Sequence, residues 1–65
     1  MAKYPDIEVQ LVGQDGNAFA IMASVTRGLR DAGISKEEIE LYQKESMSGD
    51  YDNLLRTAMN WVTVS

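Results

Sequence analysis

The sequence predicts a small α+β domain in which one short strand, or a two-stranded sheet, packs against three helices. Three features of the 65 residues support this prediction. One early segment alternates apolar and polar residues, three later segments have helical periodicity behind a capping residue, and the tail is β-prone. The expected order is β-α-α-α, with an optional final strand. A chain of this length forms one domain, expected to span residues 1–65.

The first strand is expected over Asp6–Val12, where apolar and polar residues alternate. Its apolar face would consist of Ile7, Val9 and Leu11. Pro5 stands directly before this segment, where the missing N–H group of a proline costs little. Asp15-Gly16 after it is a strong turn signal, so the strand should end before that point.

Two structures remain open for residues 18–25. A second hairpin strand would place Phe19, Ile21, Ala23 and Val25 on one face. A helix from Ala18 to Ala32 would place Ala18, Ile21, Met22, Val25, Leu29 and Ala32 on one stripe. We favour the helix, because the segment is rich in alanine, is longer than a typical strand and ends at Gly33. Asp15 or Asn17 would cap its first turn.

The second helix has the clearest predicted start. Ser35 and Glu38 stand at the positions of a capping box, and Ile34 and Ile39 stand at those of a hydrophobic staple. Gly49 should close this helix. Its inward side chains would be Ile39, Tyr42, Ser46 and Met47.

A third helix should begin after Asp50, whose carboxylate can cap it. Its apolar stripe would be Tyr51, Leu54, Leu55, Ala58 and Val62. Residues 62–65 are β-prone and would leave the helix as a short strand beside the first one. The expected core consists of Ile7, Val9, Leu11, Phe19, Ile21, Val25, Leu29, Ile39, Tyr42, Leu54, Leu55, Ala58 and Val62.

The composition argues against several kinds of site. The chain has no cysteine and no histidine, so it lacks thiolates, the commonest metal ligand and the usual general base near neutral pH. Its acidic residues gather at the predicted helix starts, where capping explains them. We therefore expect no enzyme activity, no cofactor and no bound metal. The net charge of −4 argues against direct binding to nucleic acid.

The sequence also lacks membrane and export signals. Its longest apolar run, Ala18–Ala23, is too short to span a bilayer. The first residues carry no apolar stretch of the kind found in secretory signals. A cytoplasmic protein without a membrane partner is expected.

Four residues are candidates for binding a partner. Trp61 and Met59 cannot both lie on the apolar stripe of the third helix, so one of them should face outward as a binding hot spot. Arg27 and Arg30 lie about one turn apart on the polar side of the first helix. They could bind carboxylates or a phosphate group of a partner.

The favoured function is a non-enzymatic protein-interaction module that binds an unidentified protein or itself. A homodimer could form by pairing the edges of two Asp6–Val12 strands, although like charges on Asp6 and Glu8 oppose some registers. The alternative is an acidic decoy or regulator that occupies the basic site of a nucleic-acid-binding protein. A decoy needs its carboxylates in one contiguous array, whereas capping would disperse them.

Several segments together resemble those of a group of small uncharacterised bacterial and phage proteins. The resemblance covers most of the chain and rests on Ile7–Leu11, DGNAF at Asp15–Phe19, SGDYDNLL at Ser48–Leu55, and WV at Trp61-Val62. It implies a bacterial or phage source and a cytoplasmic location. It brings no activity and no functional residue with it.

Overall fold

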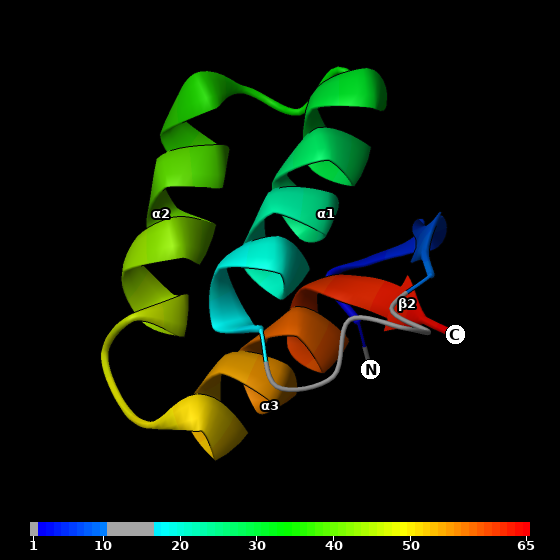
Figure 1. Cartoon of the computed structure of the whole chain (residues 1–65). Helices are drawn as coiled ribbons and strands as arrows, with labels where there is room; N and C mark the ends of the chain where they lie inside the picture. Colours follow the sequence, from blue (N-terminus) through cyan, green and yellow to red (C-terminus); the bar gives the residue numbers. More distant parts are fainter. Residues whose placement is uncertain (1, 11–16) are drawn as a thin grey trace.

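Two parallel strands and three helices make up the part of the chain that the computed structural model describes, residues 2–10 and 17–65. Their order is β1 (Tyr4–Val9), α1 (Ala18–Asp31), α2 (Lys36–Ser46), α3 (Tyr51–Trp61) and β2 (Val62–Val64). Helices α1 and α2 lie side by side, α3 crosses below their ends, and the sheet lies on the α1 side (Figure 1). The α+β class and the order β-α-α-α-β are thereby confirmed, including the final strand.

The sheet consists of β1 and β2 alone in the described residues. Its register pairs Tyr4 with Val62, Glu8 with Thr63 and Val9 with Val64, so β1 contains extra residues between its first and second pairs. Pro5 lies in this irregular stretch and has no N–H group to donate to the ladder. The hydroxyl of Thr63 donates to the carbonyl of Pro5 at 2.8 Å, which gives that carbonyl a partner.

β1 differs from its predicted bounds. It begins at Tyr4, two residues before Asp6, so Pro5 is inside the strand rather than ahead of it. Pro5 is tolerated there because the register is already irregular at this point. Leu11, Val12 and the predicted turn at Asp15-Gly16 lie outside the described residues.

Each helix begins at a side-chain cap. The side chains of Asn17, Ser35 and Asp50 accept hydrogen bonds from the backbone N–H three residues later, at 3.0, 3.3 and 3.0 Å. Residues 18–25 are helical, so the helix prediction is confirmed and the hairpin strand is excluded. At the capping box only the Ser35 half forms, because the carboxylate of Glu38 is bound by Lys3 and Tyr4 instead.

Helix α1 ends in a Schellman motif. Gly33 has a φ of +81°, its N–H donates to the carbonyl of Arg30, and the N–H of Ile34 donates to that of Leu29. A side chain at position 33 would meet no neighbour, so the positive φ is what favours glycine there. The chain can therefore reverse direction within the four residues between Asp31 and Lys36 and start α2 beside α1.

The core lies between the three helices and the sheet. Ten apolar residues are buried in the described part of the chain: Val9, Ile21, Val25, Leu29, Ile39, Tyr42, Leu54, Ala58, Trp61 and Val62. Gly28 allows α1 to approach β1 closely, since a Cβ atom there would lie 2.9 Å from a methyl group of Val9. No helix in the described residues has the length and apolar character needed to cross a membrane.

Three large apolar side chains expected inside are exposed: Phe19, Met47 and, at 37%, Tyr51. Phe19 has 77% of its surface exposed and Met47 has 64%. Phe19 lies about 200° around α1 from Ile21, because an α-helix turns about 100° per residue, so the two cannot share one face. Helix α2 ends at Ser46 rather than at Gly49, which leaves Met47 as its C-cap and outside the inward stripe. Ile7 and Leu55 are only partly buried.

Candidate functional site

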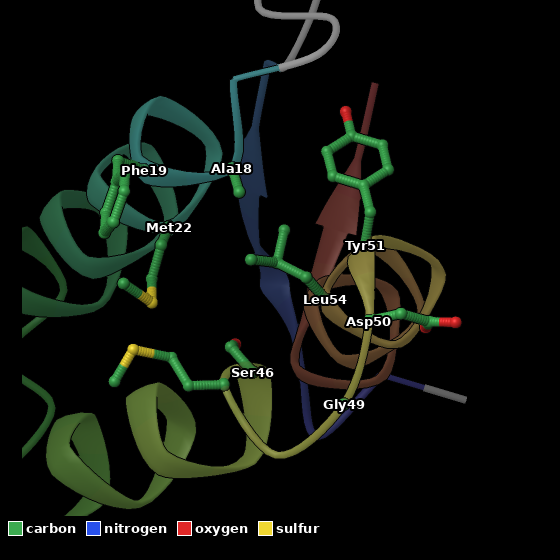
Figure 2. A pocket seen from close by; sticks show the side chains of 9 residues that line it. Ala18, Phe19, Met22, Ser46, Gly49, Asp50, Tyr51 and Leu54 are labelled. Carbon is green, nitrogen blue, oxygen red and sulfur yellow. The ribbon is translucent and has the colours of Figure 1, made fainter.

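Exposed apolar side chains gather where the start of α1 faces the end of α2 and the start of α3. Phe19, Met47 and Tyr51 border a hollow of about 290 Å³, which we call the first hollow. Figure 2 shows Phe19 and Met22 of α1 on one side of it and Tyr51 and Leu54 of α3 on the other. Its remaining lining residues are Ala18, Ser46, Met47, Gly49 and Asp50.

The corner between α2 and α3 fixes one wall of the first hollow. The side-chain amide of Asn53 donates to the carbonyl of Glu45 at 3.0 Å, and the hydroxyl of Ser48 donates to the same carbonyl at 2.7 Å. This carbonyl belongs to the last turn of α2, whose acceptors have no partner within the helix. The bonds therefore join the end of α2 to the first turn of α3, beside Met47 and Tyr51, which both line the hollow.

One residue lining the first hollow, Ser46, is a buried polar side chain. Ser46 is fully buried there, and neither its hydroxyl nor that of the nearby Tyr42 has a hydrogen-bond partner within the described residues. Burial raises the pKa of Tyr42, because the phenolate form would lose its hydration. Tyr42 therefore stays protonated and neutral near neutral pH.

The first hollow continues into a longer surface between α1 and α2. Phe19, Ala23, Thr26 and Arg30 form a ridge on α1, and Lys36, Glu40, Gln43 and Met47 form a ridge on α2. Both ridges follow the spacing of residues that share one helix face. The side-chain amide of Gln43 donates to the hydroxyl of Thr26 at 3.2 Å across the middle. We call these two ridges with the groove between them the α1–α2 face.

The α1–α2 face changes from apolar to charged along its length. A second hollow of about 410 Å³ shares Phe19 and Met22 with the first and is also lined by Arg27 and Arg30. A third hollow, also of about 410 Å³, shares Arg30 with the second and adds Lys36 and Glu40. The face thus runs from Phe19 at an apolar end to Arg30 at a basic end.

Both candidate arginines lie on the α1–α2 face. Arg27 and Arg30 are exposed and line the second hollow together. Arg27 also lines a separate hollow together with Glu8 and Asp31. The one ion pair within residues 2–10 and 17–65 is Lys3–Glu38, so neither arginine forms an ion pair with a described carboxylate. Their guanidinium groups are therefore able to bind an anionic group from outside.

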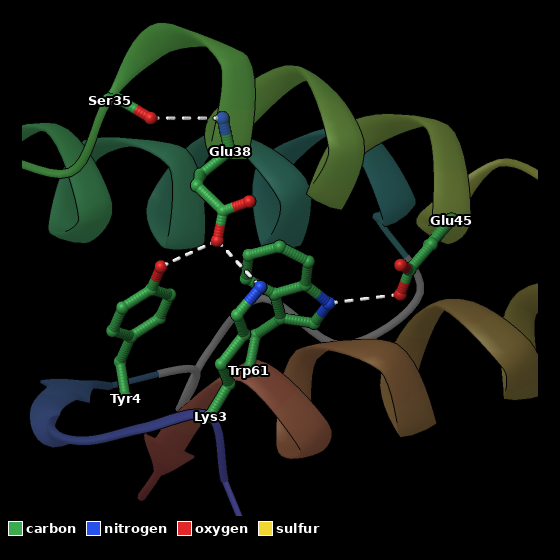
Figure 3. Close-up of polar contacts among 6 residues, drawn as sticks. All are labelled: Lys3, Tyr4, Ser35, Glu38, Glu45 and Trp61. Atoms are coloured by element: carbon green, nitrogen blue, oxygen red, sulfur yellow. Dashed lines mark hydrogen bonds and ion pairs between the residues drawn. The ribbon is translucent and has the colours of Figure 1, made fainter.

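Trp61 and Met59 separate as the sequence requires, with one inside and one outside. Met59 is 61% exposed and lies outside the three hollows. Trp61 is only 3% exposed, and its indole N–H donates to Glu45 Oε1 at 3.0 Å (Figure 3). Its ring packs against Tyr42 and Tyr4, with centroids 5.7 and 5.9 Å away. Trp61 is therefore a core residue and offers no surface to a partner.

A polar cluster that the sequence does not reveal covers the outer side of Trp61 (Figure 3). Lys3 Nζ lies 2.6 Å from Glu38 Oε1 and 4.5 Å from the centroid of the indole ring, and Tyr4 donates to the same carboxylate oxygen at 2.7 Å. Hydrogen bonds from Lys3 and then from Tyr4 lower the pKa of Glu38, and the bond to Glu38 raises the pKa of Lys3. Through Lys3, Tyr4 and Glu38, this cluster links the start of β1 to α2.

The described residues contain no group of three or more acidic side chains close enough to hold a metal ion. Comparisons of the chain with protein-family models, with curated proteins and with solved structures found no match. The resemblance to small bacterial and phage proteins therefore stays a prediction. The α1–α2 face is the feature on which a function can be argued.

Proposed function

We propose that this chain is a non-enzymatic protein-interaction module that binds a partner protein through the apolar end of the α1–α2 face. The observation that supports the proposal is the gathering of the exposed side chains of Phe19, Met47 and Tyr51 around one hollow. Clustered exposed apolar side chains are typical of interaction sites. Methionines such as Met22 and Met47 adapt their shape to different partners.

The exposed apolar side chains at this site can supply part of the binding energy for a partner. Covering a Phe or Met side chain fully is worth roughly 1.5–3 kcal/mol. Phe19 and Met47 together therefore offer about 3–6 kcal/mol before the costs of association are counted. The capping network of Asn53 and Ser48 holds this end of the face in place, so little further ordering is required when a partner binds.

The two other expected modes of action have less support. An acidic decoy needs free carboxylates in one array, but the carboxylates of Glu38, Glu45 and Asp50 have intramolecular partners. Self-association through β1 would use a strand that already pairs with β2 on one side and carries exposed Asp6 and Glu8. Like charges placed opposite each other across a dimer would destabilise it.

The experiment compares three matched variants in a pull-down from host lysate. Phe19→Ser and Met47→Ser remove apolar contacts at the hollow, and Met59→Ser removes an equally exposed methionine elsewhere. We expect one stoichiometric partner that is retained by the wild type and by Met59→Ser but lost with the other two. Thermal melting followed by circular dichroism checks that all variants are folded.

The outcomes decide between surfaces. Loss of the partner with Met59→Ser alone would place the binding site on the outer side of α3 and overturn the assignment to the α1–α2 face. A partner retained by every variant but released by salt would favour the decoy, because exposed charge pairs are screened. A concentration-dependent mass without any partner would favour self-association.

A further inference from the structure

We propose that the partner contributes an acidic amphipathic helix, which lies along the α1–α2 face with its apolar end at Phe19 and its carboxylates at Arg27 and Arg30. This inference rests on the proposed function and specifies the chemistry of the partner. Three observations support it: the shape of the face, the position of its charges, and the contrast of those charges with the rest of the molecule.

The shape of the face fits a helix. Two antiparallel helices border the groove, and an amphipathic helix laid in such a groove is a recurring mode of recognition. From Phe19 to Arg30 the α1 ridge spans eleven positions, which corresponds to about 16 Å of helix axis. A partner helix of about three turns therefore reaches from the apolar end to the basic end.

The charges on the α1–α2 face indicate which residue types the partner should carry. Arg27, Arg30 and Lys36 are three of the six basic residues in the chain, and all three line the second or third hollow. No acidic residue is found among the described residues that line the second hollow. Glu40 is the single carboxylate lining the third, so the basic end keeps an excess of positive charge. Guanidinium groups bind carboxylates through paired N–H donors, which favours Asp or Glu on the partner.

An acidic protein segment fits this face better than a nucleic acid. The chain has a net charge of −4, which repels a long polyanion such as a phosphate backbone. The arginines are also continuous with Phe19 and Met22 through the second hollow. A ligand that satisfies the whole face must be anionic at one end and apolar at the other, as a short amphipathic helix is.

The test selects ligands without assuming their sequence. A displayed library of random peptides, long enough for about four helical turns, is selected on the immobilised wild-type chain. Affinities of the enriched peptides are then measured by fluorescence anisotropy for the wild type, for the double variant Arg27→Glu with Arg30→Glu, for Phe19→Ser and for Met59→Ser. Duplex DNA of similar length is measured alongside.

The proposal expects peptides in which apolar residues precede or follow Asp or Glu by about seven to eleven positions, the spacing of two to three helical turns. Reversing both arginine charges should weaken binding at least about tenfold, because two attractive pairs become repulsive. Replacing the acidic residues of a peptide by lysine should restore its binding to the double variant. Met59→Ser should bind as the wild type does.

The failures are distinguishable. Peptides that need Phe19 but carry no acidic residues, or that bind the double variant unchanged, would overturn the acidic helix and leave the apolar binding site standing. A spacing of about four or five positions would point to an extended partner and overturn the helical one. Binding of DNA in preference to every peptide, or no peptide that depends on Phe19, would overturn both proposals.

Discussion

Glu38 connects the two ends of the polar cluster because one of its carboxylate oxygens accepts hydrogen bonds from both Lys3 and Tyr4. Lys3 in turn lies over the indole ring of Trp61. A single charged group therefore couples the residue before β1, the first turn of α2 and the end of α3. Its protonation should affect how firmly the sheet is held to the helices.

The shifted pKa values predict a pH dependence of stability. Because the pKa of Glu38 in the folded chain is below its usual 4.5, its contribution is present above that value and is lost as the pH falls through the folded pKa. Because the pKa of Lys3 is raised above 10.5, its contribution is present below that value and is lost as the pH rises through the folded pKa. Both contributions are therefore complete only between these two limits.

Urea unfolding of Glu38→Gln and of the exposed neighbour Glu37→Gln measures this effect. We expect the free energy of unfolding of Glu38→Gln to fall less between neutral and acidic pH than that of Glu37→Gln. Equal pH dependence of the two variants would show that the carboxylate of Glu38 adds no acid-sensitive stability.

Leu54 and Phe19 border the same hollow and should respond differently to truncation. Leu54 is buried, so Leu54→Ala is expected to lower the free energy of unfolding by about 2–5 kcal/mol. Phe19 is exposed, so Phe19→Ala should change it by about 0.5 kcal/mol or less. Chemical unfolding of both variants gives the comparison. A large loss with Phe19→Ala would mean that this ring supports the fold rather than a partner.

At the scale of the elements, the sequence predicts where each helix starts but not which side chains of each helix point into the core. Asn17, Ser35 and Asp50 act on backbone groups three residues away, so their signals are local. Phe19 sits in a segment that is apolar nearly all round, where periodicity cannot assign one inner face. Its exposure follows from the burial of Ile21, which lies on the opposite side of α1.

The candidate site was predictable only in part. Arg27 and Arg30 stand out from sequence as a pair on a polar helix side, and the structure places both in the second hollow. Trp61 was misleading because its burial depends on Glu45, Tyr4 and Lys3, which are distant in sequence. Phe19 and Met47 come together only when α1 and α2 are antiparallel neighbours.

The contact of α1 with β1 at Gly28 gives a prediction for the sheet. Alanine usually stabilises a helix interior by about 1 kcal/mol relative to glycine. At position 28 its Cβ would lie 2.9 Å from the side chain of Val9, and such overpacking costs about 1–3 kcal/mol. We therefore expect Gly28→Ala to lower the melting temperature.

A double-mutant cycle separates the two contributions. In a Val9→Ala background the clashing methyl group is absent, so Gly28→Ala should become neutral or stabilising. If Gly28→Ala destabilises both backgrounds equally, the cost arises within α1 and not from its packing on β1.

At the scale of the whole molecule, local and distant contacts are unequally distributed. Helices α1 and α2 follow each other through a short turn at Gly33, whereas β1 and β2 are separated in the sequence by all three helices. Bringing distant segments together lowers the entropy of the chain before the contacts between them can stabilise the structure. The sheet should therefore close late in folding, after the helical pair has formed.

Folding kinetics can test this order. Val9→Ala in β1 and Ile39→Ala in α2 each remove buried apolar atoms. Val9→Ala should mainly speed unfolding, whereas Ile39→Ala should mainly slow folding. Stopped-flow measurements over a range of urea concentrations give both rates. A folding rate slowed equally by both substitutions would show that the sheet forms together with the helices.

The parallel direction of β1 and β2 also determines how the molecule bears mechanical load. A tether at Tyr4 and another at Val64 would pull the two strands past each other along their length, because Tyr4 begins one strand and Val64 ends the other. The ladder would then be sheared, with its hydrogen bonds loaded together, including the flanking bonds from Lys3 to Asn60 and from Ser65 to Val9. A hairpin pulled at its open end would instead lose its bonds one by one. The three helices lie between β1 and β2 in the sequence. Under tension, the ladder between the strands therefore carries the force, and the helices bear no load until the ladder breaks.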